Sequence, residues 1–192
     1  MGTSDIALIL QRLLAITDTG LSFAASDFDR ERYADIRENL NQLLSETSHL
    51  EPDELSDLLR PTDFYATPLV DVRAFIVQQD KICLVWALPG GFCEVGLSPK
   101  ENIVKEIQEE TGFQASVVRL LAVFDSNKFQ PQSKQYVKLV FECQLKEGDF
   151  QPNLEIAEMS FFAPQDSEKR ITKEQMQLLW DIYQNQQEQY ID

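Results

Sequence analysis

The segment between Ser98 and Gly112 carries a full set of helix start and stop signals, and it constrains the fold more than any other stretch. Ser98 is a preferred N-cap residue, Pro99 suits the first helical position, and Glu101 completes a capping-box pattern. Gly112 stands where a C-terminal cap is expected. The sequence therefore predicts a helix from about Pro99 to Thr111.

This predicted helix carries three carboxylates on one side. Glu106, Glu109 and Glu110 are neighbours on a helix surface because residues three and four apart lie together, and Ile103 and Ile107 form a second stripe that can face a core. Like charges at this spacing destabilise a helix by roughly 0.2–0.5 kcal/mol per pair. Most such clusters are solvated acidic faces, but a divalent cation would relieve the repulsion, and Mg²⁺ prefers carboxylate and phosphate oxygens.

A Pro-Gly-Gly turn at residues 89–91 precedes the helix at a fixed distance. With it, residues 88–113 resemble the Nudix signature, G-x5-E-x7-R-E-U-x-E-E-x-G-U, in which U is aliphatic or aromatic. The matching positions are Gly91, Glu106, Ile107, Glu109, Glu110, Gly112 and Phe113. A globular domain with a merely acidic helix would require this spacing to be accidental.

Two positions depart from the signature. Leu97 stands where its first glutamate is expected, and Lys105 replaces its arginine. Glu94 lies in the same loop and is a candidate substitute for the missing carboxylate. Lys105 keeps the positive charge and can pair with Glu101 and Glu109 at i±4, without the bidentate fork of arginine.

The resemblance implies a metal site and a reaction. Glu106, Glu109 and Glu110 would bind Mg²⁺, or Mn²⁺, together with the backbone carbonyl of Gly90, and Lys105 would belong to the same catalytic group. A bound metal polarises phosphorus and lowers the pKa of water. One of the glutamates, or a carboxylate on a later loop, would orient or deprotonate that water. Candidates on the later loop are Glu155 and Glu158, for which a plain acidic loop is an equal alternative.

Substrate contacts are less readable from the sequence. Arg73 lies in a predicted strand among apolar residues, where a long cation usually has a partner or a ligand, so phosphate contact is one of two alternatives for it. Gly91 is expected at the substrate. Aromatic candidates for stacking on the nucleotide are Phe64, Tyr65 and Phe129, each of which can instead pack internally.

The composition excludes several functional classes. The chain has 192 residues, a formal charge of −15 and 43% hydrophobic residues, as in soluble globular proteins. So negative a chain lacks the basic stripe that broad nucleic-acid binding needs. No apolar run approaches a membrane span, and the first residues indicate an amphipathic helix and not a signal peptide. Three cysteines without metal-type spacing, Cys83, Cys93 and Cys143, fit reduced thiols in a cytoplasm.

The pattern of apolar residues divides the chain in two. Residues 1–66 indicate a small helical domain: a first helix ending near Thr19-Gly20, a second capped by Asp27, and a short third one over Pro52–Leu59. Residues 67–192 alternate with a strand period on either side of the signature helix. Strands are predicted at 70–77, 82–86, 115–124, 136–145 and 159–162, with a last helix capped by Thr172. We expect an α+β fold, in which a small all-helical N-terminal domain precedes a Nudix α/β/α sandwich with a mixed sheet.

The resemblance extends to a bacterial Nudix subgroup whose helical N-terminal domain precedes hydrolases of X-linked nucleoside diphosphates. Members commonly carry Leu and Lys at the two departing positions and are typically dimers, so a homodimer is expected. One segment departs further: Val85 runs directly into Trp86 and the Pro-Gly-Gly turn, as if a loop had been removed. The second half of this region would then lose its strand pairing, or one strand would do the work of two.

These patterns favour a Mg²⁺-dependent pyrophosphohydrolase that cleaves a nucleoside diphosphate linked to another group X, in the CDP-choline or ADP-ribose class, giving NMP and X-phosphate. Two alternatives remain open. One is a Nudix-like nucleotide-binding or regulatory module without turnover, favoured by Leu97 and the shortened segment. The other is an RNA-end processing hydrolase, disfavoured by the negative charge.

Overall fold

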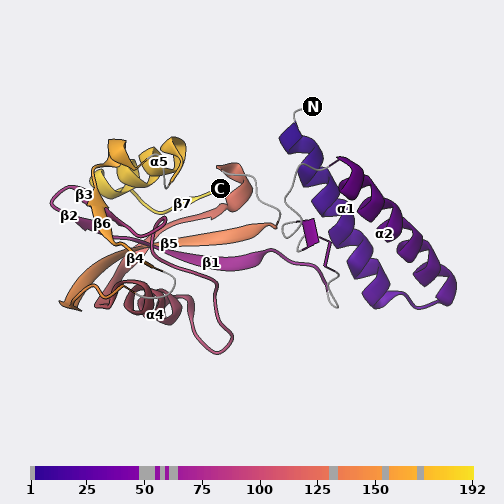
Figure 1. The fold of residues 1–192 in the computed structure, drawn as a ribbon, viewed down its shortest axis with the longest axis horizontal. Helices are drawn as coiled ribbons and strands as arrows, with labels where there is room; N and C mark the ends of the chain where they lie inside the picture. Colours follow the sequence, from indigo (N-terminus) through magenta and orange to yellow (C-terminus); the bar gives the residue numbers. More distant parts are fainter. Residues whose placement is uncertain are drawn as a thin grey trace. The chain divides into compact units, whose positions relative to one another are not determined.

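The computed structural model describes residues 3–47, 55–56, 59–60, 65–129, 134–152, 156–167 and 171–192 (Figure 1). The chain forms two compact units, residues 1–68 with 131–134, and residues 69–130 with 135–192. The domain boundary expected between residues 66 and 67 remains a prediction. The short helix expected over Pro52–Leu59 lies largely outside the described residues.

The N-terminal unit is built on two paired helices, α1 (Thr3–Phe23) and α2 (Asp27–Thr47) (Figure 1). Leu14, Leu40 and Leu44 form their buried core. Helix α1 continues past Gly20, where the sequence predicted its end. A Cβ on Gly20 would lie 2.4 Å from the ring of Tyr33, so this glycine serves helix packing and not termination.

The start of α2 also differs from the prediction. Asp27 is the first residue of the helix, and the cap is Ser26, whose hydroxyl accepts a hydrogen bond of 3.1 Å from the backbone N–H of Asp29. Ser and Asp are both good N-cap residues, and they stand side by side here. Which of the two becomes the N-cap depends on the backbone conformation of the residues that lead into α2, and N-cap propensity does not encode this conformation.

The second unit contains all seven strands of the described residues. They are β1 (Leu69–Phe75), β2 (Val77–Gln78), β3 (Lys81–Leu84), β4 (Phe113–Asp125), β5 (Tyr136–Gly148), β6 (Ser160–Phe162) and β7 (Tyr190–Ile191). One sheet has the order β1-β5-β4-β7, in which β1 is parallel to β5, β4 is antiparallel to β5, and β7 is parallel to β4. The other, β2-β3-β6, is antiparallel. Gln79 and Asp80, both with positive φ, form the hairpin turn between β2 and β3.

Helices α4 (Pro99–Thr111) and α5 (Lys173–Gln184) cover opposite faces of these strands (Figure 1). On β1, Val72 and Ala74 join the cluster of Ile103 and Ile107 from α4, whereas Phe75 joins the cluster that contains Leu179 of α5. The predicted α/β/α sandwich with a mixed sheet is confirmed. Two 3₁₀ turns, η1 (Ser126–Lys128) and η2 (Pro164–Asp166), complete the unit.

The caps of the last two helices are those that the sequence predicted. Ser98 and Glu101 form the capping box of α4, and Gly112 takes the left-handed conformation at φ 77°. Thr172 caps α5 by accepting a hydrogen bond from the N–H of Gln175. No helix among the described residues is long and apolar enough to cross a membrane.

The shortened segment after Val85 keeps its strand pairing. Strand β3 ends at Leu84, and residues 89–93 then run antiparallel along the free edge of β1. The backbone hydrogen bonds are Ala74 N to Pro89 O at 2.7 Å, Val72 N to Gly91 O at 2.9 Å and Cys93 N to Val70 O at 3.0 Å. The expectation of lost pairing was therefore wrong, because β1 offers an unpaired edge that the short connection can reach.

Candidate active site

Gly90 is fixed against β1 in a conformation that only glycine adopts readily. Its φ is +142°, and a Cβ there would lie 2.0 Å from the carbonyl oxygen of Val72. The hydrogen bonds of Pro89 and Gly91 to β1 hold the backbone on both sides of it. The N–H and carbonyl of Gly90 are thereby left for partners other than the backbone of β1.

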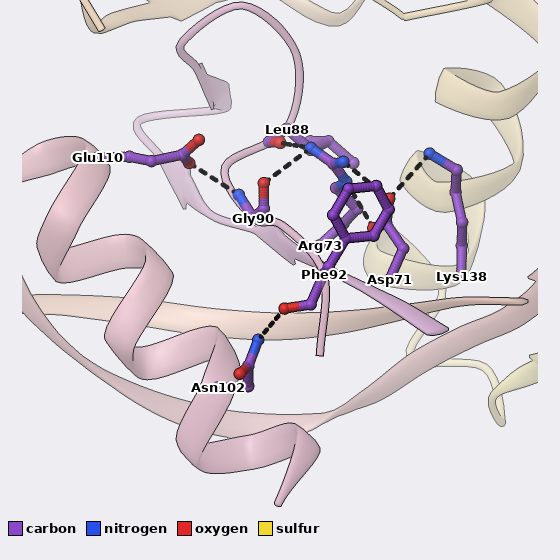
Figure 2. A network of polar contacts seen from close by, with 8 residues as sticks. All are labelled: Asp71, Arg73, Leu88, Gly90, Phe92, Asn102, Glu110 and Lys138. Carbon is purple, nitrogen blue, oxygen red and sulfur yellow. Dashed lines mark hydrogen bonds and ion pairs between the residues drawn. The ribbon is translucent and has the colours of Figure 1, made fainter. Parts of the chain in front are cut away.

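Glu110 binds the backbone N–H of Gly90. Its Oε2 accepts a hydrogen bond of 2.8 Å from the N–H of Gly90 (Figure 2). This bond ties the last turn of α4 to the glycine turn. One of the three predicted carboxylates is thus in contact with the residue whose carbonyl was predicted to share the metal.

Glu106 reaches the same turn one residue later. A Cβ on Gly91 would lie 2.8 Å from Glu106 Oε2, so the missing side chain makes the space that the carboxylate occupies. Burial raises the pKa of Glu106, the nearby Lys105 opposes this, and the charge of Glu109 adds to the rise. The role of Gly91 in this structure is to admit a carboxylate, and contact with substrate remains a prediction.

Lys105 bridges two carboxylates on the outside of α4. Its Nζ lies 2.6 Å from Glu109 Oε2 and 2.9 Å from Glu94 Oε1, and hydrogen bonds to Glu109 and then to Glu94 raise the pKa of Lys105. The pairing with Glu109 matches the sequence prediction. The pairing with Glu101 does not occur, because Glu101 Oε2 accepts hydrogen bonds from the N–H and hydroxyl of Ser98.

Asn102 connects α4 to the loop before it, and the sequence did not single it out. Its amide is fully buried, and Nδ2 donates to the carbonyl of Phe92 at 2.9 Å (Figure 2). Its Oδ1 accepts from the N–H of Glu94 at 3.0 Å. A polar residue beside the apolar stripe of Ile103 and Ile107 was the available signal. The contact sets the distance between helix and loop.

Arg73 has partners that the sequence did not identify. Its guanidinium binds Asp71 through two hydrogen bonds, Nε to Oδ1 at 2.7 Å and Nη2 to Oδ2 at 2.8 Å. Nη1 donates to the carbonyl oxygens of Leu88 and Gly90 at 3.2 and 3.0 Å (Figure 2). Lys138 Nζ lies 3.5 Å from Asp71 Oδ2, the oxygen that also accepts from Arg73 Nη2. Phosphate contact by Arg73 remains a prediction, but the partner of this cation is a carboxylate two residues away on the same side of β1.

The donor set fits a divalent cation of hard character. Glu106 and Glu110 both lie against the glycine turn, Glu109 is on the same side of α4, and the Gly90 carbonyl stays outside the backbone ladder with β1 and accepts a hydrogen bond from Arg73 Nη1. Among the described residues, no three His, Cys, Asp or Glu side chains are gathered closely enough to hold an ion. Their charges repel, and Glu109 and Glu110 each bind a local hydrogen-bond donor.

Other predicted residues are not brought to this cluster by any described contact. Glu158 is exposed and accepts a hydrogen bond from the hydroxyl of Ser160. Tyr65 is exposed in the N-terminal unit, and Phe129 packs edge-on against Phe124 with ring centroids 4.9 Å apart. Phe64 and Glu155 lie outside the described residues. Substrate contact by Tyr65 and water activation by Glu158 remain predictions.

The arrangement of a glycine turn, a capped acidic helix and an α/β/α sandwich defines a class of phosphate-bond hydrolase, and comparisons with known proteins place the chain within it. Residues 45–180 match the sequence model of the NUDIX domain. Residues 4–59 match a second model, described as a UDP-X-like, N-terminal oligomerisation domain.

Individual relatives cover between about two thirds and all of the chain. A crystal structure of a UDP-X diphosphatase is 59% identical, with all of both chains covered and a TM-score of 0.64. That of an ADP-ribose pyrophosphatase from Streptococcus suis is 36% identical, covers 66% of this chain and 100% of that one, and has a TM-score of 0.59. The Bacillus subtilis protein named "Putative ADP-ribose pyrophosphatase YjhB" is 38% identical over 90% of this chain and 89% of its own.

The chain therefore belongs to the Nudix family. It is a Nudix pyrophosphohydrolase, as the signature over residues 88–113 predicted, and it has the helical N-terminal region predicted from the apolar pattern of residues 1–66. Enzymes of this family generally use divalent metal ions. The family membership thus supports the hydrolase hypothesis over that of a nucleotide-binding or regulatory module without turnover.

Proposed function

We propose that this protein is a Mg²⁺-dependent hydrolase of a nucleoside diphosphate linked to a second group X, which releases NMP and X-phosphate. The observation that carries the proposal is the glycine turn, where Gly90 and Gly91 hold the carboxylates of Glu110 and Glu106. The relatives named for UDP-X and ADP-ribose support a substrate of this class. CDP-choline belongs to the same chemical class and is retained as a candidate. Mn²⁺ is the expected substitute metal.

The residues divide the work by position. Glu106, Glu109 and Glu110 would hold the cation from α4, and the carbonyl of Gly90 would complete the protein ligands. The ion, when bound, would neutralise the diphosphate and lower the pKa of water. Lys105 holds the Glu109 carboxylate through their 2.6 Å ion pair.

The decisive assay measures release of NMP and X-phosphate from ADP-ribose, a UDP-sugar and CDP-choline, with and without Mg²⁺. Glu109→Gln should reduce turnover at least about 100-fold, since a charge stabilisation of several kcal/mol is at stake. Glu174→Gln, an exposed carboxylate at the start of α5, is the matched control and should be silent. A folded wild-type protein that binds these nucleotides and hydrolyses none of them with Mg²⁺ or Mn²⁺ would overturn the proposal in favour of the binding module. Cleavage confined to RNA ends would favour the third alternative.

We also propose that the protein is a cytoplasmic homodimer. Its three cysteines are free thiols, which fits a reducing compartment.

Helix α1 carries a second apolar stripe beside the one that packs on α2. The exposed members of this seam are Ile6, Ile9, Leu13, Ile16 and Phe23, with exposed fractions between 41% and 65%. From Ile6 to Ile16 their spacing alternates between three and four residues, as in helices that pair along a heptad seam. The description of the matched N-terminal domain as an oligomerisation domain supports a second copy of the chain as the partner.

A further inference from the structure

The backbone of the glycine turn alternates between two sides. The carbonyls of Pro89 and Gly91 point to β1, where they accept hydrogen bonds from Ala74 and Val72. The carbonyls of Leu88 and Gly90 are not part of this ladder, and both accept from Nη1 of Arg73. Nη1 of Arg73 therefore donates to both carbonyls of the turn that are left outside the ladder.

Asp71 fixes the guanidinium that makes these contacts. It occupies the Nε–Nη2 edge with two hydrogen bonds of 2.7 and 2.8 Å, and its side chain is only 4% exposed. A planar guanidinium held along one edge has its remaining nitrogen in a fixed direction. Lys138, opposite Asp71 on β5, adds a second cation at 3.5 Å and keeps the carboxylate in place. Figure 2 shows the chain of contacts from Lys138 through Asp71 and Arg73 to Gly90.

We propose that Asp71 and Arg73 form a positioning pair that sets the direction of the Gly90 carbonyl and thereby the metal affinity of the site. The inference rests on the proposed function, in which this carbonyl is a metal ligand. A carbonyl oxygen has two lone pairs. Arg73 occupies one of them from a fixed side, and Glu110 holds the N–H of Gly90, so the second lone pair has a defined direction. Asp71 neutralises the guanidinium charge beside the cation.

The test measures Mn²⁺ binding to the substrate-free protein by electron paramagnetic resonance, together with steady-state kinetics. Arg73→Gln should weaken Mn²⁺ binding about 10–100-fold, the usual effect of removing a group that orients a metal ligand. KM for the nucleotide at saturating metal should stay within about twofold. Asp71→Asn should give the same defect, and the double variant should be no weaker than either single one, because the two residues act as one unit.

Arg119 provides a matched control on the same sheet. Its Nε binds Glu142 at 2.8 Å, and Nη1 and Nη2 donate to the carbonyls of Gln187 and Ile182, so it repeats the arrangement of an arginine between a carboxylate and two carbonyls. Arg119→Gln should lower the free energy of unfolding by about as much as Arg73→Gln does, and it should leave Mn²⁺ binding unchanged. If Arg73→Gln does not fold, Arg73→Lys decides, because it keeps the charge and loses the fork.

The outcomes separate this inference from the proposed function. A wild-type protein that neither binds Mn²⁺ nor hydrolyses nucleotides would overturn both. Wild-type activity with normal Mn²⁺ binding in folded Arg73 and Asp71 variants would overturn the positioning pair alone. A raised KM in Arg73→Gln with unchanged Mn²⁺ affinity would show instead that Arg73 contacts phosphate.

Discussion

The carboxylate of Glu110 accepts a hydrogen bond of 2.8 Å from the backbone N–H of Gly90, twenty residues before it in the sequence. One bond therefore ties the end of α4 to the turn that follows β3. The same carboxylate is a proposed metal ligand. Its structural and chemical tasks can be separated by substitution.

Glu110→Gln should keep the structural task and lose the chemical one. The amide oxygen of glutamine can still accept from Gly90, so the melting temperature should stay close to that of the wild type. Turnover should fall at least about 100-fold because a metal-binding charge is lost. Glu110→Ala should lose turnover and also about 1 kcal/mol of stability, the contribution of a typical hydrogen bond. Urea unfolding and product release measure both; equal activity of Glu110→Gln and wild type would contradict the assignment.

The two adjacent glycines should respond differently to alanine. Gly90→Ala places a Cβ against backbone at positive φ, so we expect a loss of about 3 kcal/mol or more, or failure to fold. At Gly91 the obstacle is the flexible end of Glu106. Gly91→Ala should therefore fold with nearly unchanged melting temperature and lose activity by displacing that carboxylate. Circular dichroism melts together with the hydrolysis assay check this, and an active Gly91→Ala enzyme would show that the position of Glu106 is unimportant.

The metal-free protein should lose stability as the pH rises through the range in which Glu106 ionises. Burial raises the pKa of Glu106 in the folded state above that of the unfolded chain. Between the two pKa values the folded state binds more protons, so the free energy of unfolding falls with rising pH. Glu106→Gln should remove this part of the slope and be more stable than the wild type at neutral pH without metal. Melting temperatures from pH 4 to 8 in a chelator test it; a slope unchanged by the substitution would contradict it.

Ile16→Glu should convert the proposed dimer into a monomer. The charge would lie in the exposed seam of α1, where self-association would bury it without a partner. Ala34→Glu introduces the same charge at an exposed position of α2, on the side away from Ile36 and Leu43, and should leave the mass unchanged. Sedimentation equilibrium over a range of concentrations gives the mass. A wild-type monomer at every concentration would exclude the dimer.

Local signals predicted much of the fold. The limits of α4 followed from Ser98, Glu101 and Gly112 because each cap is specified by residues within one turn. The end of α1 did not, because the reason for Gly20 is a ring thirteen residues away, that of Tyr33. Strand β7 was also missed. Two residues are too short to show a period, and the strand exists through its pairing with β4.

The sequence predicted the chemical groups of the candidate site but not the hydrogen bonds that position them. The signature identified Glu106, Glu109 and Glu110 because helical spacing alone places them on one side. Asn102 was missed because its role depends on loop atoms that only the fold brings near. Asp71 was also missed, although it lies two residues from Arg73 on the same side of β1. Arg73 stood out as a cation in a strand, and the sequence left its partner open.

The path of residues 89–93 along β1 has a consequence for the solubility of the protein. Strand β1 is the last strand of its sheet, and its outer edge would otherwise offer unpaired N–H and carbonyl groups to another molecule. The glycine turn covers that edge. Variants that release the turn from β1 would thus uncover a template for strand addition, and loss of catalysis there would be accompanied by a tendency to aggregate.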